Sequence, residues 1–194
     1  MTPARLEAFT DGVVAIIITI MVLELRVPHG TDLVALREDV PLLLAYVLSY
    51  VNVGIFWNNH HHMLHVTERI DGSVLWANLA LLFWLSLVPF VIRWIDEAGF
   101  APLPTAAYGV VLVGAAVSYI VLEWRIVAVN GRSSRLAVAV GNEFKGNVSL
   151  ALYVAAVALA FVRPWLSIAL YVAVALLWLV PDRRIEALVK RALP

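Results

Sequence analysis

Four of the five histidines of the chain gather between positions 60 and 65. His61 and His65 stand four residues apart, a spacing that puts two imidazoles on one face of a helix, where they can bind zinc. A complete zinc site needs another ligand, for which Glu68 and Asp71 are the nearby candidates. Histidine also changes charge near neutral pH, so the cluster is a candidate pH sensor. The structural alternative stays open: a helix end emerging into water, with no metal bound.

A second group of residues lies within the first apolar stretch of the chain. From Arg5 to Arg26 the chain is long enough for about 33 Å of helix, which crosses a bilayer. Within it, Ile16, Ile20 and Leu23 fall on one helical face. Such a stripe either packs against a neighbouring helix or points at a central axis.

The same stretch carries charges that are costly in lipid. These are Arg5, Glu7, Asp11 and Glu24. We therefore expect this helix to be covered by other helices or by water. A cleaved signal peptide is not expected, because Asp11 interrupts the apolar run and no small-residue cleavage pattern follows.

Several classes of chemistry are excluded by composition. The chain has no cysteine, which excludes disulfides, thiolate metal sites and cysteine nucleophiles. Basic and acidic residues balance at 14 each, so there is no basic excess to hold a nucleic acid. No Gly-x-Ser-x-Gly, His-Glu-x-x-His or glycine-rich phosphate loop occurs. We expect neither an enzyme nor a bound cofactor, and no metal site beyond the weak candidates His61 and His65.

The overall composition indicates a membrane protein. Of 194 residues 62% are hydrophobic and only 14% charged, against roughly 25% charged in soluble proteins. The apolar stretches predict an all-α membrane protein with six transmembrane helices, near 4–26, 40–66, 73–95, 104–129, 144–162 and 164–181. We expect residues 1–181 to form one domain. Residues 182–194 form a short basic tail that lies on the membrane surface.

The basic residues predict the orientation. With both termini in the cytoplasm, the cytoplasmic helix ends carry Arg5, Arg69, Arg125, Arg132, Arg135, Lys145, Arg183, Arg184, Lys190 and Arg191, and the outer ends carry Arg26, Arg37, Arg93 and Arg163. This distribution obeys the positive-inside rule. The outer ends also hold Glu24, Asp32, Glu38, Asp39, Asp96 and Glu97, so that side mildly attracts cations.

Three short segments carry a family resemblance. Arg5-Leu6-Glu7-Ala8-Phe9-Thr10-Asp11, followed by Ala15-Ile16 and Thr19, resembles the Arg-x-x-x-Phe-Ser-Asp signature of the endolysosomal potassium channel family of transmembrane protein 175, in its prokaryotic branch. Phe56-Trp57-Asn58-Asn59-His60 is similar to the family's Trp-x-x-His in the second helix, and Asn78 and Pro89-Phe90 to its third-helix pattern. Thr10 replaces the family's usual serine but keeps the hydroxyl. By motif, the resemblance covers the first half of the chain.

The resemblance implies an architecture and roles for residues. The family's animal relatives hold two six-helix repeats in one chain and form dimers, so a single repeat implies a homotetramer in the lipid of the prokaryotic plasma membrane, with the first helices around the axis. The constricting residues of the family correspond to Ile16, Ile20 and Leu23, with Ile16 as the principal ring. The signature implies a network that ties the first helix to the second and third, formed by Arg5, Phe9, Thr10, Asp11, Trp57, His60 and Asn78.

The implied constriction has definite chemistry. A ring of isoleucines offers a cation no ligand, so an ion must shed part of its water to pass, and a narrow enough ring dewets and closes. Filter and gate can thus be one element. Thr19 either offers a hydroxyl to the ion or bonds its own helix. Glu24 either forms a cation-attracting ring at the outer mouth or is held in a salt bridge.

The function we expect is a weakly selective, potassium-permeable cation channel. No Thr-Val-Gly-Tyr-Gly filter is present, so only modest selectivity is expected. The alternative is a secondary transporter or proton-coupled cation carrier, for which inverted repeats, broken helices and ionisable residues near the midplane are typical. The sequence offers little of these, with Pro89 the one proline well inside an expected span.

Overall fold

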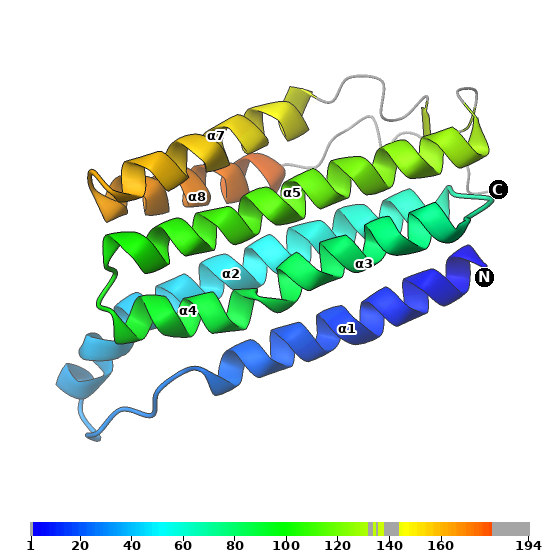
Figure 1. Ribbon diagram of the computed structural model, residues 1–194. Helices are drawn as coiled ribbons and strands as arrows, with labels where there is room; N and C mark the ends of the chain where they lie inside the picture. The colour runs from blue at the N-terminus through cyan, green and yellow to red at the C-terminus, as the bar shows by residue number, and fades with distance from the viewer. Residues whose placement is uncertain (1, 132–133, 135, 138–143, 180–194) are drawn as a thin grey trace.

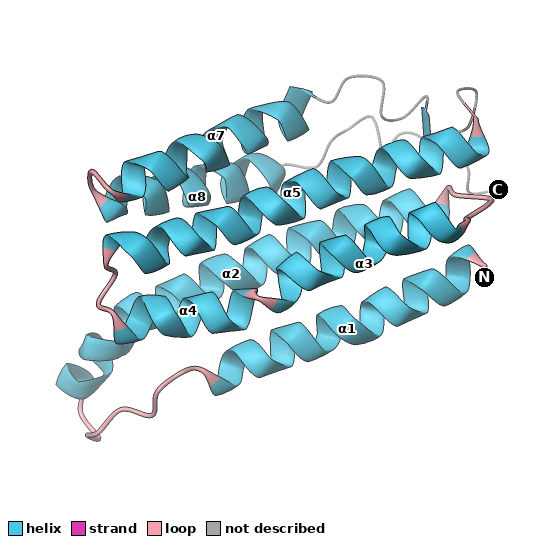
Figure 2. Cartoon of the chain, viewed as in Figure 1, coloured by secondary structure: helices cyan, strands magenta, loops and turns pink. Residues whose placement is uncertain are grey.

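All the regular structure in the part of the chain that the structure describes is helical (Figure 2). The computed structural model describes residues 2–131, 134, 136, 137 and 144–179. The helices are α1 (Pro3–Leu23), α2 (Leu33–His65), α3 (Gly72–Ser86), α4 (Val88–Glu97), α5 (Pro102–Asn130), α7 (Phe144–Ala160) and α8 (Pro164–Leu179). The predicted tail, 182–194, lies outside the described residues.

Four segments are long and apolar enough to cross a membrane: α1, most of α2, α3 together with α4, and α5. The shorter apolar helices α7 and α8 complete the set of six expected from the sequence. Their positions agree with the predicted stretches to within a few residues, except at the start of α2. The all-α membrane fold is therefore confirmed.

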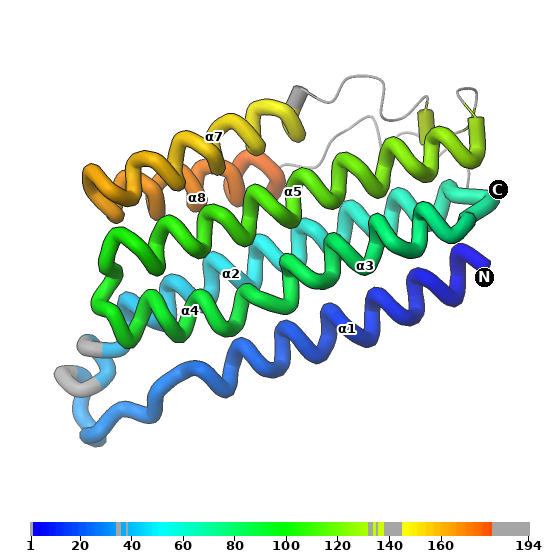
Figure 3. The backbone as a smooth tube through the Cα atoms, viewed as in Figure 1, coloured from blue at the N-terminus to red at the C-terminus, as the bar shows by residue number. Residues whose placement is uncertain are grey.

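The second helix begins earlier than the predicted residue 40. It starts at Leu33 and continues through Pro41, which lies inside the helix. A proline lacks the amide hydrogen that an interior helical position donates, and it bends or breaks a helix there. From Pro41 the helix continues to His65, and its course can be followed in Figures 1 and 3.

The third expected span is divided into two helices at Leu87. Pro89 stands at the start of α4, where its missing N–H costs nothing, but it cannot continue α3 because its ring clashes with the preceding turn. The Ser86 hydroxyl donates to the Phe83 carbonyl over 2.7 Å at the end of α3. The break gives this span two axes, and both segments contact α1.

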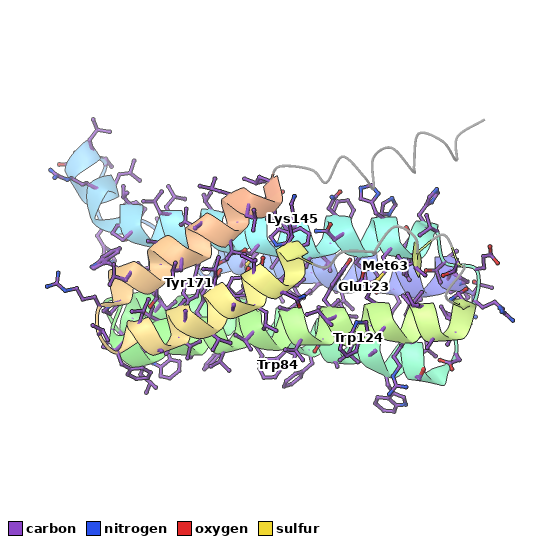
Figure 4. All side chains as sticks on the ribbon, turned by 90° about the horizontal axis from the view of Figure 1, so that it is seen from above. Met63, Trp84, Glu123, Trp124, Lys145 and Tyr171 are labelled. Atoms are coloured by element: carbon purple, nitrogen blue, oxygen red, sulfur yellow. The ribbon has the colours of Figure 1, made fainter. Side chains whose placement is uncertain are left out.

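Helix α5 is the centre of the bundle. It packs on α3 and α4 on one side and on α7 and α8 on the other, and α1 lies at the edge beyond α3 and α4 (Figure 1). Two glycines of α5 allow close approach: a Cβ at Gly114 would meet the Trp84 ring of α3, and one at Gly109 would meet the Tyr171 hydroxyl of α8. Trp84 and Tyr171 come from helices on different sides of α5 (Figure 4).

Hydrogen bonds between buried polar side chains join helices of the bundle, as is common where water is excluded. Tyr108 of α5 accepts from the Ser49 hydroxyl over 2.9 Å and from the Asn52 amide over 3.3 Å, both on α2. The Tyr171 hydroxyl donates to the Thr105 carbonyl over 3.1 Å. These bonds link α2 and α8 to the central helix α5.

Candidate functional site

The first helix has one packed face and one uncovered face. It packs against α2, α3 and α4 through residues that are almost fully buried: Leu6, Thr10, Val14, Ile17 and Met21. The stripe singled out in the sequence lies on the opposite face, where Ile16, Ile20 and Leu23 are 58%, 41% and 77% exposed. Within one chain no other helix covers this face.

Thr19 shares the uncovered face with the three apolar residues. Its hydroxyl is 3.0 Å from the Ala15 carbonyl and 2.9 Å from the Ile16 carbonyl, so it donates back to its own helix. This is the local bond expected of a threonine in a membrane helix. The hydroxyl hydrogen of Thr19 is therefore engaged within α1.

A polar network joins the packed face of α1 to α2 and α3. The Asn78 amide of α3 donates to the Thr10 hydroxyl over 3.0 Å, and its carbonyl oxygen is 2.7 Å from His60 Nε2. An amide oxygen only accepts, so the neutral His60 ring carries its proton on Nε2. His60 Nδ1 is buried and takes no hydrogen bond from the described residues.

The indole of Trp57 forms the next link, donating to Asp11 Oδ1 over 2.8 Å. Of the seven residues assigned to the network by resemblance, the structure thus brings together Thr10, Asp11, Trp57, His60 and Asn78. The other two, Arg5 and Phe9, have exposed side chains on the uncovered face and take no part in these bonds.

The histidine cluster supplies another link between α1 and α2. His61 Nδ1 lies 2.6 Å from Glu7 Oε1, and the His61 ring stacks on His65 with centroids 6.2 Å apart. Asp71 instead caps α3: hydrogen bonds from the Ser73 hydroxyl and from the backbone N–H groups of Val74 and Ser73 lower the pKa of its carboxyl. Among the described residues, no group of three or more metal-ligating side chains is arranged to hold an ion.

Ion pairs attach the other end of α1 to α4. Glu24 lies 3.6 Å from Arg93, which also pairs with Glu97 at 2.9 Å, and Arg26 lies 2.7 Å from Asp96. Of the two sequence interpretations of Glu24, the structure shows the salt bridge. The pairs that join Arg93 to Glu24 and Arg26 to Asp96 link residues about seventy positions apart, and nothing in the local sequence pattern predicted them.

The site is therefore a helix held at both ends and open along one side. Hydrogen bonds fasten one end to α2 and α3, ion pairs fasten the other to α4, and the apolar stripe between them faces outward.

Comparisons with known proteins agree with this arrangement. A family model described as the endosomal/lysosomal potassium channel TMEM175 matches residues 5–89. A protein named a potassium channel from Chryseobacterium sp. (strain P1-3) is 49% identical over 190 residues, covering 98% of this chain and 99% of its own. A potassium channel of Streptomyces collinus is 32% identical, with 71% of this chain and 76% of that one covered.

A solved structure supports the likeness over the whole fold. The crystal structure of a lysosomal potassium-selective channel TMEM175 homologue from Chamaesiphon minutus superposes with a TM-score of 0.77 and 26% identity, over 92% of this chain and 96% of that one. Chicken endosomal/lysosomal proton channel TMEM175 is 37% identical over 102 residues, only 20% of its own length. The chain, an integral membrane protein, belongs to the TMEM175 family of potassium channels.

Proposed function

We propose that four copies of this chain assemble around an axis lined by their α1 helices and form a potassium-permeable channel. Family membership makes the chain a potassium-permeable channel, and ion channels are not an enzyme class. The constriction, the fourfold assembly and the orientation are our proposal. Its setting is the plasma membrane, with lipid around the outer helices.

The observation that carries the proposal is the two-sided character of α1. Its packed face is built into the subunit, while Ile16, Ile20 and Leu23 remain exposed on the other face. Exposed apolar residues alone fit lipid as well as a pore. The network around Thr10 and the ion pair at Arg26 fix the rotation of α1 about its own axis, so the same face is presented by every subunit.

The chemistry of the constriction follows from the side chains. Four isoleucines at one level replace no water ligands of a passing ion, so an ion with a weakly held hydration shell passes more easily. Potassium holds its water less tightly than sodium, which favours potassium without a carbonyl filter. Thr19 lies one turn from the Ile16 level and exposes its oxygen lone pairs on the same face.

Substituted cysteines test this lining sharply, because the natural chain contains no cysteine. We expect Ile16→Cys and Ile20→Cys channels to be blocked by silver ions, which are close to potassium in size and react with thiols. The matched control is Val22→Cys, an exposed position of the same helix about 120° from Ile16. Block of Val22→Cys with none at Ile16→Cys would show that a different face lines the pore.

A flux measurement separates the channel from a carrier. Protein in liposomes with a potassium gradient is expected to pass discrete single-channel currents whose reversal potential follows that gradient. Saturable uptake in fixed stoichiometry with protons would instead support the carrier. Native mass spectrometry of the same preparation counts the subunits, and an assembly other than four would overturn the proposed symmetry.

A further inference from the structure

One charged residue lies on the uncovered face of α1. Between Pro3 and Leu23, all of which the structure describes, Arg5 is the only charged residue that is exposed, whereas Glu7 and Asp11 are partly buried. At about 100° per residue, the eleven positions between Arg5 and Ile16 bring the two to within about 20° of the same line along the helix. At about 1.5 Å per residue, Arg5 lies about 16 Å from the Ile16 level.

The acidic residues near Arg5 in the sequence contact side chains of α2 and not Arg5. Glu7 pairs with His61 of α2, and Asp11 accepts a hydrogen bond from Trp57, which also belongs to α2. Glu7 is about 180° around the helix from the line of Arg5 and Ile16. No described ion pair involves Arg5, so nothing in the described residues balances its charge on this face.

We infer that Arg5 forms a ring of positive charge at the inner mouth of the pore and makes conduction asymmetric. This rests on the proposed function, which brings four α1 helices to one axis. The ring lowers the local concentration of cations at that mouth, so potassium enters less readily from the cytoplasmic side than from the outer side. Inward current therefore exceeds outward current at equal and opposite voltages.

The effect has a salt dependence that identifies it as electrostatic. The screening length is about 10 Å at 0.1 M salt and about 3 Å at 1 M. The charge of the ring thus reaches across a pore mouth in dilute potassium chloride and not in concentrated solution. Rectification is expected to be clear at about 20 mM and nearly absent at about 1 M.

The test modifies one residue in channels that have already assembled, so that folding is not in question. Arg5→Cys channels are recorded in planar bilayers in symmetric potassium chloride at about 20 mM. A positively charged methanethiosulfonate reagent is expected to restore the rectification that the Arg5→Cys substitution removes. A negatively charged reagent is expected to raise outward current at least twofold and to reverse the asymmetry. Equal effects of the two reagents would overturn the inference.

Two substitutions complete the design. Arg5→Lys keeps the charge and is expected to keep the rectification, whereas loss of rectification in this variant would assign Arg5 a geometric role and overturn the inference. Arg125→Gln removes an exposed charge on α5, on the other side of α3 from α1 (Figure 1), and is expected to conduct like the natural chain. If Arg125→Gln and Arg5→Gln changed the rectification equally, the effect would come from the overall surface charge and the inference would be wrong.

The outcome is separable from that of the proposed function. If silver blocks Ile16→Cys while neither reagent alters Arg5→Cys currents, α1 lines the pore and the ring of charge is wrong. If silver leaves Ile16→Cys and Ile20→Cys untouched, the pore lining itself is wrong.

Discussion

The indole N–H of Trp57 donates a 2.8 Å hydrogen bond to the carboxylate of Asp11, joining α2 to α1 across 46 positions of sequence. Together with the bond from Asn78 to Thr10, it attaches α1 to the rest of the subunit. Under the proposed function, these bonds affect the pore through the position of α1 and not by contact with the ion.

Loss of this bond is expected to weaken the attachment of α1. Trp57→Phe keeps most of the ring but removes the donor, leaving the Asp11 carboxylate without its partner. Because Trp57 is 41% exposed, water can take the place of the lost donor, so we expect a destabilisation of about 0.5–1.5 kcal/mol. Thermal unfolding in detergent measures it. The control, Trp76→Phe, changes a ring of α3 that is 75% exposed, and a loss as large there would remove the special role of Trp57.

The Thr10 hydroxyl is expected to matter more than its methyl group. Thr10→Val keeps the shape but leaves the buried Asn78 amide without its acceptor, at a cost of about 1–3 kcal/mol. Thr10→Ser keeps the acceptor and is expected to cost less, through the lost methyl group alone. Thermal unfolding and yield of intact assembly compare the two. A serine variant less stable than the valine variant would contradict the role given to this hydrogen bond.

Gly114 is expected to tolerate no side chain. A Cβ there would enter the ring of Trp84, so Gly114→Ala must push α3 and α5 apart, with a cost of about 1–3 kcal/mol or more. A Cβ at Gly54 of α2 would meet nothing within 4 Å, and Gly54→Ala is expected to be neutral or slightly stabilising because alanine favours a helix. Equal melting temperatures for the two alanine variants would refute the close approach of α3 and α5.

The contact between His61 and Glu7 is expected to hold the N-terminal part of α1 against α2. His61 Nδ1 lies 2.6 Å from Glu7 Oε1, so Glu7→Gln removes the charge of the acceptor from this contact between the two helices. The neighbouring rings of His62 and His65 lie beside His61. Currents recorded from internal pH of about 8 to about 5.5 are expected to change less in Glu7→Gln than in the natural chain.

The same series includes the double variant His61→Ala/His65→Ala. An identical pH response in this variant, in Glu7→Gln and in the natural chain would eliminate the cluster as a pH sensor. The metal alternative predicts something different, namely a zinc effect that the double variant abolishes. Among the described residues these two histidines have no third side chain arranged with them to hold an ion, so we expect zinc to have no effect specific to them.

The sequence by itself determined the membrane class, the six apolar segments and the one face shared by Ile16, Ile20 and Leu23. These features are local: span length follows from apolar run length, and a helical face follows from 3.6 residues per turn. The resemblance also supplied the partners Trp57, His60 and Asn78. Neither the periodicity nor the charge count says which side of a helix meets its neighbours.

Only the tertiary structure decided that side. It packed Thr10 and Ile17 into the subunit, left Ile16 uncovered, and placed Arg5 with the apolar stripe rather than with the network. It also joined Arg26 to Asp96 and engaged Glu24 with Arg93. The physical reason is that each of these outcomes depends on groups tens of residues away in sequence, which meet only after α2, α3 and α4 have packed around α1.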